Sequence, residues 1–568
     1  MKKNKLIIIG NGIAGNLAAL YISQKLPELE ITIVGKTDKP RTLVGESTVE
    51  LSTHFFEALG LGKLLEDKHY HKYGLTYYFK TKKDANDPNY VVHEAPGVIR
   101  LPAYNLNRFT FDNDLRELNS KRNIKVIKGT VQDVSLKTST QKHHILSVEM
   151  EDSEKTNLML EADWFIDSSG TRRFLAKKLA LRKDPGYQRS TFWFRLKKFD
   201  RNIFNKISAL KSKHHCYDSY YVTHHFYGKG YWIWMIPMRS PDGETMISIG
   251  YTYRTEQGAE IVRTVDDFIN TVEKDHPIIT EIVKSGEINT LSEDVLDIAA
   301  YTNYMYESKQ YYSKDGWFLI GDSAFLFDPI NSLGLSYVSH MICQVAAIIS
   351  KDKEGNLTNS YIDCHEKHIQ SILSLQDSWG KWYEIMHDPV KLSWTLLMNN
   401  MSYFNVLLPA FINGAFLDGR HIDVFTEQFK RLPVEQQGPA YPFPKLLDIL
   451  SEQSKNIDLS CLPNLYSKNI PFGLYKADEK LRKKLFLRYL FRLITLRTAI
   501  IKRINWKLNK HHLSVLGESL WDNCVDFVRI ILVSLFSHGL VKYHKSDDPD
   551  ATPFGDNGKF LKFNDTTK

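Results

Sequence analysis

Three glycines near the start of the chain, Gly10, Gly12 and Gly15, have the spacing of a dinucleotide-binding turn. They follow a short apolar run, residues 5–9, and precede a segment with helical periodicity, residues 16–26. In such a strand–turn–helix unit the glycines allow a tight turn, a close approach of backbone to pyrophosphate, and close packing of helix on strand. Free N–H groups at the helix N-terminus favour the anion. The predicted phosphate-binding residues are Gly10, Gly12, Ile13, Ala14 and Gly15.

A second nucleotide contact is expected far along the chain, where Asp322 follows the apolar run 317–320. Such an aspartate either caps a helix or binds a sugar hydroxyl. The end of the second predicted strand, residues 31–34, has no acid for the ribose, so that contact must come from a backbone group or from Thr37 or Asp38. A second contact so distant from the glycine turn suits an extended FAD better than NAD, and we therefore expect FAD.

The elements that must position these residues change in type along the chain. Residues 192–253 have a β pattern, with strands at 231–238 and 245–252 joined by a turn at 240–243. Beyond about residue 338 the apolar periodicity is helical, including a basic amphipathic segment at 477–508. A helix over 105–119 and short strands at 124–127 and 130–136 are also expected.

Three motifs resemble those of the flavin-dependent halogenases, and they occur in the family's order over roughly residues 5–350. They are Gly45-Glu46-Ser47-Thr48, Trp232-Ile233-Trp234-Met235-Ile236-Pro237, and Gly321-Asp322-Ser323-Ala324 followed by Asp328-Pro329 and Ser332-Leu333-Gly334. The second motif is the family's most specific one. The helical C-terminal region is similar to that of the phenol- and pyrrole-type members, more than to the tryptophan halogenases.

The resemblance implies a reaction. FADH2 from a separate flavin reductase would react with O2 to give a C4a-hydroperoxide, and chloride or bromide would attack it. The resemblance places the halide at Ser332, Leu333 and Gly334. Hypohalous acid would then pass through an internal channel to a lysine, which delivers the halogen to an electron-rich aromatic carbon.

Trp232, Trp234 and Pro237 are expected to separate flavin from substrate. On a strand, positions 232 and 234 face the same side, so the two indoles can form one wall. Core packing is the competing role for these indoles.

The relay lysine is predicted to be Lys72, in a Lys72-Tyr73-Gly74 context some two dozen residues after the Gly-Glu-Ser element. Lys80 is the second candidate. A relay lysine has to be buried enough to hold an oxidant and still be reactive.

Asn331 stands where tryptophan halogenases have a glutamate. A neutral amide cannot stabilise a cationic ring intermediate as a carboxylate does. Phenols and pyrroles stabilise that cation through their own lone pairs, so the substrate is expected to be of phenol or pyrrole type, free or bound to a carrier protein. A base or donor for a phenol could come from His224, His225, Tyr220 or Tyr221, for which the competing position is the strand surface.

Further FAD contacts are predicted at Arg41, Glu46, Ser47 and Arg108. A local turn is the alternative for Glu46 and Ser47, and a surface position is the alternative for the arginines. No metal site is expected, because Cys364 and His368 on one helical face do not make a complete ligand set.

Composition limits the class of protein. The chain has 568 residues, 43% hydrophobic and 25% charged, which is typical of a globular protein of several domains. Residues 471–512 hold twelve Lys or Arg and two acids, a net charge of +10. The whole chain has a net charge of +8, so the remaining residues sum to about −2. It is either a solvated outer face, a dock for an acidic carrier protein, or a membrane-surface contact. A nucleic-acid partner is not expected, because a flavin enzyme of this kind has no use for one.

The compartment is expected to be the cytoplasm. Five scattered cysteines without a Cys-x-x-Cys pair favour a reducing compartment. The first apolar run stops at Gly10, so no signal peptide is expected, and the late apolar run 530–536 is far shorter than the ~20 residues of a membrane helix.

The predicted fold is α/β: a two-part, monooxygenase-type FAD-binding module with a Rossmann-like glycine turn, an inserted mainly antiparallel substrate sheet and a mostly helical C-terminal region. The predicted divisions are residues 1–350, with the substrate sheet at about 72–104 and 185–300, residues 351–545, and a polar tail at 546–568. Two other functions stay open, a flavin monooxygenase or oxidoreductase without halide chemistry, and a membrane-surface flavoprotein that reduces a lipid or polyprenoid.

Overall fold

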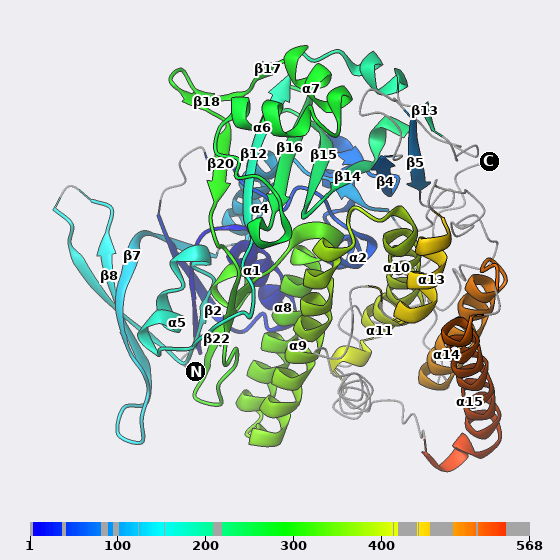
Figure 1. Ribbon diagram of the computed structural model, residues 1–568. Helices are drawn as coiled ribbons and strands as arrows, with labels where there is room; N and C mark the ends of the chain where they lie inside the picture. Colours follow the sequence, from blue (N-terminus) through cyan, green and yellow to red (C-terminus); the bar gives the residue numbers. More distant parts are fainter. Residues whose placement is uncertain are drawn as a thin grey trace, which may run out of the picture.

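Two large β-sheets and a group of helices make up most of the described part of the chain (Figure 1). The computed structural model describes residues 4–36, 41–80, 89–94, 102–122, 124–152, 154–206, 208–209, 219–412, 414–417, 440, 442–454, 481–506 and 509–540. The polar tail predicted at 546–568 lies outside these residues. The predicted α/β fold class is confirmed.

The first sheet has seven strands in the order β22-β10-β1-β2-β7-β8-β9. The pairs from β22 to β7 are parallel, and β7, β8 and β9 pair antiparallel. The strands are β1 (Lys5–Ile9), β2 (Glu30–Gly35), β7 (Lys125–Ser135), β8 (His144–Met150), β9 (Asn157–Ala162), β10 (Trp164–Asp167) and β22 (Trp317–Leu319). Strands β1, β2, β10 and β22 are buried over almost their whole length, as is usual for parallel strands inside an α/β fold.

The second sheet follows the order β13-β5-β4-β14-β15-β16-β12-β17, and β20 also pairs with β12. Its pairs are antiparallel except β4 with β14 and β5 with β13. The strands are β4 (Leu75–Lys80), β5 (Asn89–Glu94), β12 (Ser190–Lys197), β13 (Ser208–Ala209), β14 (Thr223–Gly228), β15 (Tyr231–Arg239), β16 (Thr245–Tyr253), β17 (Glu287–Ile288) and β20 (Ile298–Tyr301).

Strand β15 divides two apolar cores. Trp232 and Trp234 belong to the large core of the molecule, whereas Ile233 and Met235 belong to a smaller core on the other face. This alternation is the two-residue period of a strand. Helices α6 (Val265–Val272) and α7 (Pro277–Lys284) cover the smaller core. The two tryptophans are thereby directed together to the side of the first sheet.

Three small sheets complete the β structure that the structure describes. They are formed by β3 (Tyr70–His71) with β6 (Tyr104–Asn105), by β11 (Arg182–Lys183), β21 (Tyr306–Ser308) and β23 (Phe325–Leu326), and by β18 (Thr290–Ser292) with β19 (Val295–Leu296). The remaining helices of the first half are α1 (Ile13–Lys25), α2 (Glu50–Ala58), α3 (Gly62–Lys68), α4 (Arg108–Lys121) and α5 (Phe174–Lys178).

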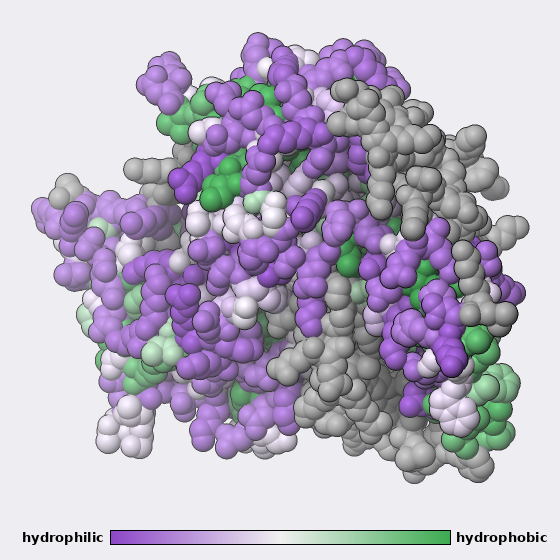
Figure 2. All heavy atoms as spheres, in the orientation of Figure 1, coloured by the Kyte–Doolittle hydropathy of each residue, from purple (hydrophilic) through white to green (hydrophobic). Residues whose placement is uncertain are grey.

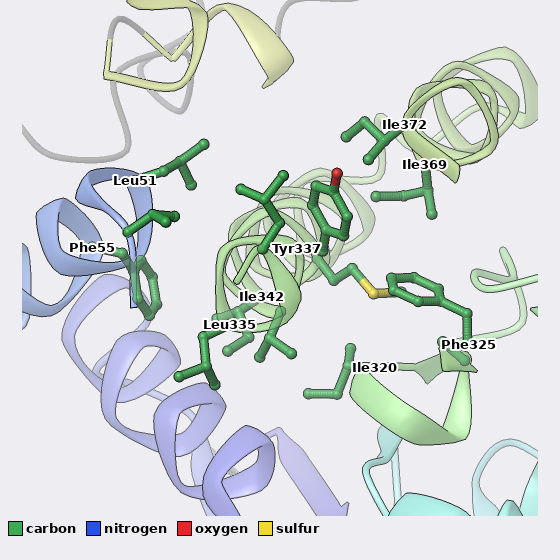
Figure 3. Packing of buried hydrophobic residues seen from close by; sticks show 14 of the residues in the cluster. Leu51, Phe55, Ile320, Phe325, Leu335, Tyr337, Ile342, Ile369 and Ile372 are labelled. Atoms are coloured by element: carbon green, nitrogen blue, oxygen red, sulfur yellow. The ribbon is translucent and has the colours of Figure 1, made fainter. Parts of the chain in front are cut away.

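Described residues after β23 contain helices and no strand, as the periodicity predicts. The helices are α8 (Gly334–Lys353), α9 (Asn359–Gly380), α10 (Pro389–Ser402), α11 (Leu408–Ile412), α13 (Pro444–Gln453), α14 (Leu481–Ile501) and α15 (Lys510–Leu540). Helix α8 lies in the middle of the large core. Figure 3 shows Leu51 and Phe55 of α2 on one side of it and Ile369 and Ile372 of α9 on another. None of the described helices combines the length and the apolar character that a membrane crossing requires.

Three predicted boundaries were wrong. The helix expected from residue 105 begins at Arg108, because the Asn107 side chain accepts a hydrogen bond from Thr110 N and caps it. The two strands expected at 124–136 are one strand, β7, with an irregularity between Val131 and Asp133. The basic helix ends at Ile501, earlier than residue 508.

Candidate functional site

The glycine turn connects β1 to α1, and its geometry is that of a tight turn on which the helix packs closely. Gly10 has φ +111°, and a Cβ there would lie 2.4 Å from the Ser168 carbonyl oxygen. A Cβ on Gly15 would lie 2.2 Å from the Gly10 carbonyl oxygen, so helix and turn pack closely. A Cβ on Gly12 would meet nothing within 4 Å. Gly12 also has no side chain to cap α1, which leaves N–H groups open to an anion.

A cavity of about 780 Å³ lies in front of this turn. Its walls include the carboxyl ends of β1, β2, β10 and β22, where ligands bind in open α/β sheets, and residues of β15 in the second sheet. Most predicted site residues line it: Gly10, Gly12, Ile13, Ala14, Arg41, Glu46, Ser47, Arg108, Trp232, Trp234, Asp322, Ser332 and Gly334.

Four predicted site residues do not line the cavity. Gly15 lies behind the turn, as its packing role requires. Pro237 is buried within β15, and the Leu333 side chain is buried at the residue that precedes α8. Lys72 is buried beyond the cavity wall. Thr37 and Asp38, named as possible ribose contacts, lie outside the described residues.

Asp322 is reached by solvent through the cavity, and it lies among arginines. Desolvation raises the pKa of its carboxyl, and the charges of Arg108, Arg173 and Arg41 oppose this rise. Ile320, and not Asp322, stands before the short 3-10 turn at 321–323, so Asp322 does not act as its cap. Its carboxylate is free to meet a hydroxyl in the cavity.

Arg108 is not a surface arginine. Its Nε donates to Asp112 Oδ1 at 2.9 Å, and a further N–H donates to the Val44 carbonyl oxygen beside the Gly-Glu-Ser segment. It thereby holds residues 44 and 45 against the start of α4. Arg41 is exposed at the cavity.

Glu46 forms a buried ion pair behind the cavity wall. Arg195 Nη2 lies 2.6 Å from Glu46 Oε1, and Arg195 Nη1 lies 2.8 Å from Asp297 Oδ1. The second Glu46 oxygen accepts from Ser248 Oγ at 3.0 Å, and Ser248 accepts from the Trp234 indole at 3.3 Å. Gly250 faces Trp234 in the register, and a Cβ there would overlap the indole. Glu46 therefore helps to fix the wall that contains Trp234.

Trp232 is fixed by a second buried chain of hydrogen bonds. Its indole donates to Tyr383 Oη at 3.0 Å, and Tyr383 donates to Asp328 Oδ2 at 2.5 Å. Arg189 Nη1 lies 3.0 Å from the same carboxylate oxygen, and the other oxygen accepts from Ile330 N. The chain connects the tryptophan wall, the helical region and the loop that precedes α8.

That loop ends in the predicted halide residues. Ser332 has φ +56° and Gly334 is the first residue of α8, and both line the cavity. Asn331 is 7% exposed, and its Oδ1 accepts from Asn399 at 3.4 Å. A cavity wall at a helix N-terminus favours an anion.

Lys72 is 3% exposed, and its Nζ donates to the Thr48 carbonyl oxygen at 2.8 Å. Thr48 follows Ser47, which lines the cavity. Burial lowers the pKa of Lys72 to about 8, while the negative charge of Glu50 opposes the decrease. Glu50 is itself buried and accepts from Tyr403 Oη at 3.0 Å. The lowered pKa gives Lys72 a larger fraction of neutral, nucleophilic amine near neutral pH than an exposed lysine has.

Lys80 has a different setting. It is the last residue of β4 and is half-buried. The two histidines of β14 are not on the strand surface, since His224 and His225 are each 1% exposed. His225 lines the cavity, and its ring lies 4.8 Å from the Trp232 ring. Burial, with the charge of Lys72, lowers the pKa of His225 well below its usual value, so this imidazole is neutral.

Comparisons with known proteins decide the family. A family model described as tryptophan halogenase matches residues 5–85 and 65–374. The chain belongs to this family of flavin-dependent halogenases. It is therefore a flavin-dependent enzyme. The open Gly12 backbone and the accessible Asp322 fit a flavin cofactor.

Relatives of the flavin-dependent halogenase span most of the chain. It is 28% identical over 484 residues to the flavin-dependent halogenase chlA of Dictyostelium discoideum, covering 80% of this chain and 77% of that one. It is 23% identical over 464 residues to a 1H-pyrrole-2-carbonyl-peptidyl-carrier-protein chlorinase of Pseudomonas fluorescens, covering 78% and 96%. The fold matches the crystal structure of halogenase PltM with a TM-score of 0.59 at 17% identity, over 90% of this chain and 98% of that one.

Several residues of the halogenase site were not found by sequence reasoning. Glu50 lies two positions after the Gly-Glu-Ser-Thr motif, and its only signal is a carboxylate at the start of a helix. Tyr383 and Tyr403 come from the helical region after residue 350, in which the sequence motifs mark no single functional residue. Arg195 and Arg189 had no signal, because what makes them functional is a partner more than a hundred positions away.

Proposed function

We propose that this halogenase oxidises chloride or bromide to hypohalous acid at the cavity and transfers the halogen through Lys72 to an electron-rich aromatic ring. The substrate class is phenol or pyrrole, free or bound to a carrier protein. The observation that carries this proposal is the burial of Lys72 against Thr48 O and near Glu50, one residue beyond the cavity wall.

The cofactor would occupy the cavity. The turn Gly10–Gly15 would hold the pyrophosphate, Asp322 would accept from a hydroxyl, and Arg41, Glu46, Ser47 and Arg108 would shape the remaining contacts. Reduced FAD, supplied by a flavin reductase, provides with O2 the oxidising power that the halide needs. The chain's own part here is to bind the cofactor and exclude bulk water.

The halide would bind at Ser332, Leu333 and Gly334. The backbone at this position is the start of α8, whose first N–H groups have no partner within the helix. The Leu333 side chain is buried, so only its backbone could take part. The halide and Lys72 are on opposite sides of the wall that contains Trp232 and Trp234 in this proposal.

The neutral Lys72 amine would take the halogen from hypohalous acid. Its nitrogen forms a bond to the halogen and loses a proton, and the released hydroxide and proton leave as water. The aromatic carbon then attacks the halogen, the nitrogen–halogen bond breaks, and the proton lost by the ring restores the Lys72 amine. The negative charge of Glu50 would hold Lys72 in place. Glu50 would also supply a carboxylate near the amine, whereas Asn331 is a neutral amide.

The substrate class rests on Asn331 and on two relatives. One relative is named a chlorinase of a pyrrole-2-carbonyl carrier protein, and a PltM structure contains phloroglucinol, a phenol, together with FAD. Both rings are electron-rich. Neutral His225, Tyr77 and Tyr227 lie together on β4 and β14, with the His225 ring 5.6 Å from that of Tyr77, and would face such a ring.

The test combines the purified protein with a flavin reductase, NADH, O2, FAD and bromide. A panel of phenols, pyrroles, a carrier-bound pyrrole and tryptophan is analysed by mass spectrometry. We expect bromination of phenols or pyrroles and none of tryptophan. Hydroxylated products in place of brominated ones would favour the monooxygenase alternative, and turnover only with a polyprenoid on vesicles would favour the lipid reductase.

Lys72→Ala is expected to reduce bromination at least about 100-fold, the lower end for loss of a positioned acid–base group. NADH-dependent O2 consumption should continue, because the flavin cavity is intact. Lys80→Ala is the matched control and should brominate like the unsubstituted protein. Normal bromination by Lys72→Ala would refute the assignment.

A further inference from the structure

Helix α15 leaves a row of large apolar side chains uncovered by any residue that the structure describes. Trp521 is 70% exposed and Leu535 is 66% exposed. Figure 2 shows hydrophobic side chains gathered at the edge of the molecule where α14 and α15 lie side by side in Figure 1. Elsewhere the face shown in Figure 2 is mainly hydrophilic. An exposed apolar patch of this kind marks an interaction surface.

The row forms one face of the helix. Its eight members are Leu513, Leu520, Trp521, Phe527, Val528, Ile531, Leu532 and Leu535. At about 100° per residue, they fall within a sector of the helix about 140° wide. The opposite face of α15 packs inward, where Val515 and Asp526 are buried and Asp526 pairs with Arg497 of α14 at 3.1 Å. Leu513, Leu520, Phe527 and Ile531 are separated by seven, seven and four positions, a spacing that keeps them on one stripe of the helix and suits helix–helix packing.

The row is close to palindromic about Cys524. Reversing the order of residues about this position exchanges six of the eight members of the row with one another. The exchanged pairs are Leu513 with Leu535, Leu520 with Val528, and Trp521 with Phe527. All six are exposed, and Cys524 is an exposed free thiol. A two-fold axis through an antiparallel helix pair imposes this relation, in which each patch meets its own copy.

We propose that α15 packs antiparallel against α15 of a second copy of this chain, with the two-fold axis at Cys524. The row is large enough, since eight side chains that each expose on the order of 100 Å² give about 800 Å² per copy, the size of a standard interface. Nothing charged interrupts it. Of the acids on α15, Glu518 pairs with Lys445 of α13 and Asp526 with Arg497.

A membrane surface suits this helix less well. Interfacial helices carry Lys and Arg on the polar face, next to the apolar one. Helix α15 has Lys510 and Arg529 against Glu518, Asp522 and Asp526, a net charge of −1 without histidines. Six of the twelve basic residues at 471–512 lie on α14, and only Lys510 lies on α15. Binding to a lipid surface would also give no reason for the symmetric arrangement of apolar residues about Cys524.

The first experiment measures the mass of the full-length protein by light scattering at micromolar concentration. We expect twice the mass of the chain. Trp521→Glu should raise the dissociation constant of the dimer about 100-fold, as loss of a central aromatic contact does, and should leave FAD binding unchanged. Phe491→Glu is the matched control: Phe491 is a 57% exposed aromatic residue on α14, outside the row, and its variant should stay dimeric.

The second experiment locates the axis with diamide, an azo compound that oxidises thiols. Two Cys524 thiols would form one S–S bond, and their two electrons and two protons would pass to diamide, which becomes a hydrazine. We expect a covalent dimer that is absent in Cys524→Ser. A monomer at micromolar concentration, including one that binds anionic vesicles, would overturn the proposal. So would a dimer that Trp521→Glu leaves intact and diamide does not link through Cys524.

Discussion

At the residue scale, the proposed function depends on a lysine whose side chain is buried, Lys72. Lys72 is held by one carbonyl oxygen, with a carboxylate near enough to influence its charge. Desolvation disfavours the ammonium form, and Glu50 favours it, so the pKa of the lysine depends on the balance of the two. Tyr403 completes the arrangement by donating to Glu50 and accepting from Leu51 N. Together these contacts would keep the amine both placed and reactive.

The pH dependence of halogenation is expected to show this balance. Bromination should rise as pH passes through about 8, because the neutral amine is the reactive form. Glu50→Gln removes the charge that raises the pKa of Lys72, so the rise should move to lower pH. Measured kcat/KM against pH checks this. Glu57→Gln, on the same helix, should not move the profile, and an equal shift in both variants would contradict the prediction.

Stability should follow the same titration. The folded-state pKa of Lys72 is lowered from 10.5 to about 8, so between these values the unfolded chain binds a proton that the folded chain has released. The contribution of Lys72 to the free energy of unfolding therefore increases as pH rises through this window.

At the element scale, strand β15 and the segment that holds Tyr383 together fix the cavity wall that contains Trp232. Trp232 is presented by the strand, and its indole N–H is satisfied only because Tyr383 arrives from beyond α9. Tyr383 also donates to Asp328, whose second oxygen caps the turn that leads to Ser332. The position of Trp232 thus depends on contacts between elements about 150 residues apart.

Tyr383→Phe is expected to lower the free energy of unfolding by ~1–3 kcal/mol, because a buried donor and a buried acceptor lose their partner. Tyr304→Phe provides the control. Tyr304 is also buried near Arg189, but its hydroxyl has no hydrogen-bond partner among the described residues, so its removal should be near neutral. Urea denaturation compares the two. Equal losses would show that the hydrogen-bond chain is not what stabilises this wall.

At the scale of the whole molecule, one core spans the predicted division at residue 350. The large core contains residues of both β-sheets and of α8, α9, α10 and α13. Polar contacts cross the same boundary, as Glu366 of α9 accepts from Tyr311 N and Tyr403 donates to Glu50. The division at residue 350 is a change in element type within a shared core.

The described parts of the chain before and after residue 350 are expected to unfold together. Calorimetry of the full-length protein should show no separate transition for the helical region. A fragment of residues 1–350 should fail to bind FAD in a folded form, because α9 and α10 would no longer cover its apolar face. A soluble fragment with a cooperative transition of its own would contradict this.

Local chemistry was predictable from the sequence alone. The glycine turn, the alternation of Trp232 and Trp234, the change from strands to helices and the halogenase motifs each depend on residues close together in the chain. Short-range rules of backbone conformation and periodicity govern such features. The cavity residues predicted from these motifs do lie together.

Only the tertiary structure decided which distant groups meet. It brings Glu50 and Tyr403 to Lys72, Tyr383 to Trp232 and Asp328, and Arg195 to Glu46. It also leaves the apolar face of α15 uncovered while the basic helix α14 packs against it. Each of these outcomes depends on burial, and burial is a property of how separate elements pack, so no local pattern in the chain contains it.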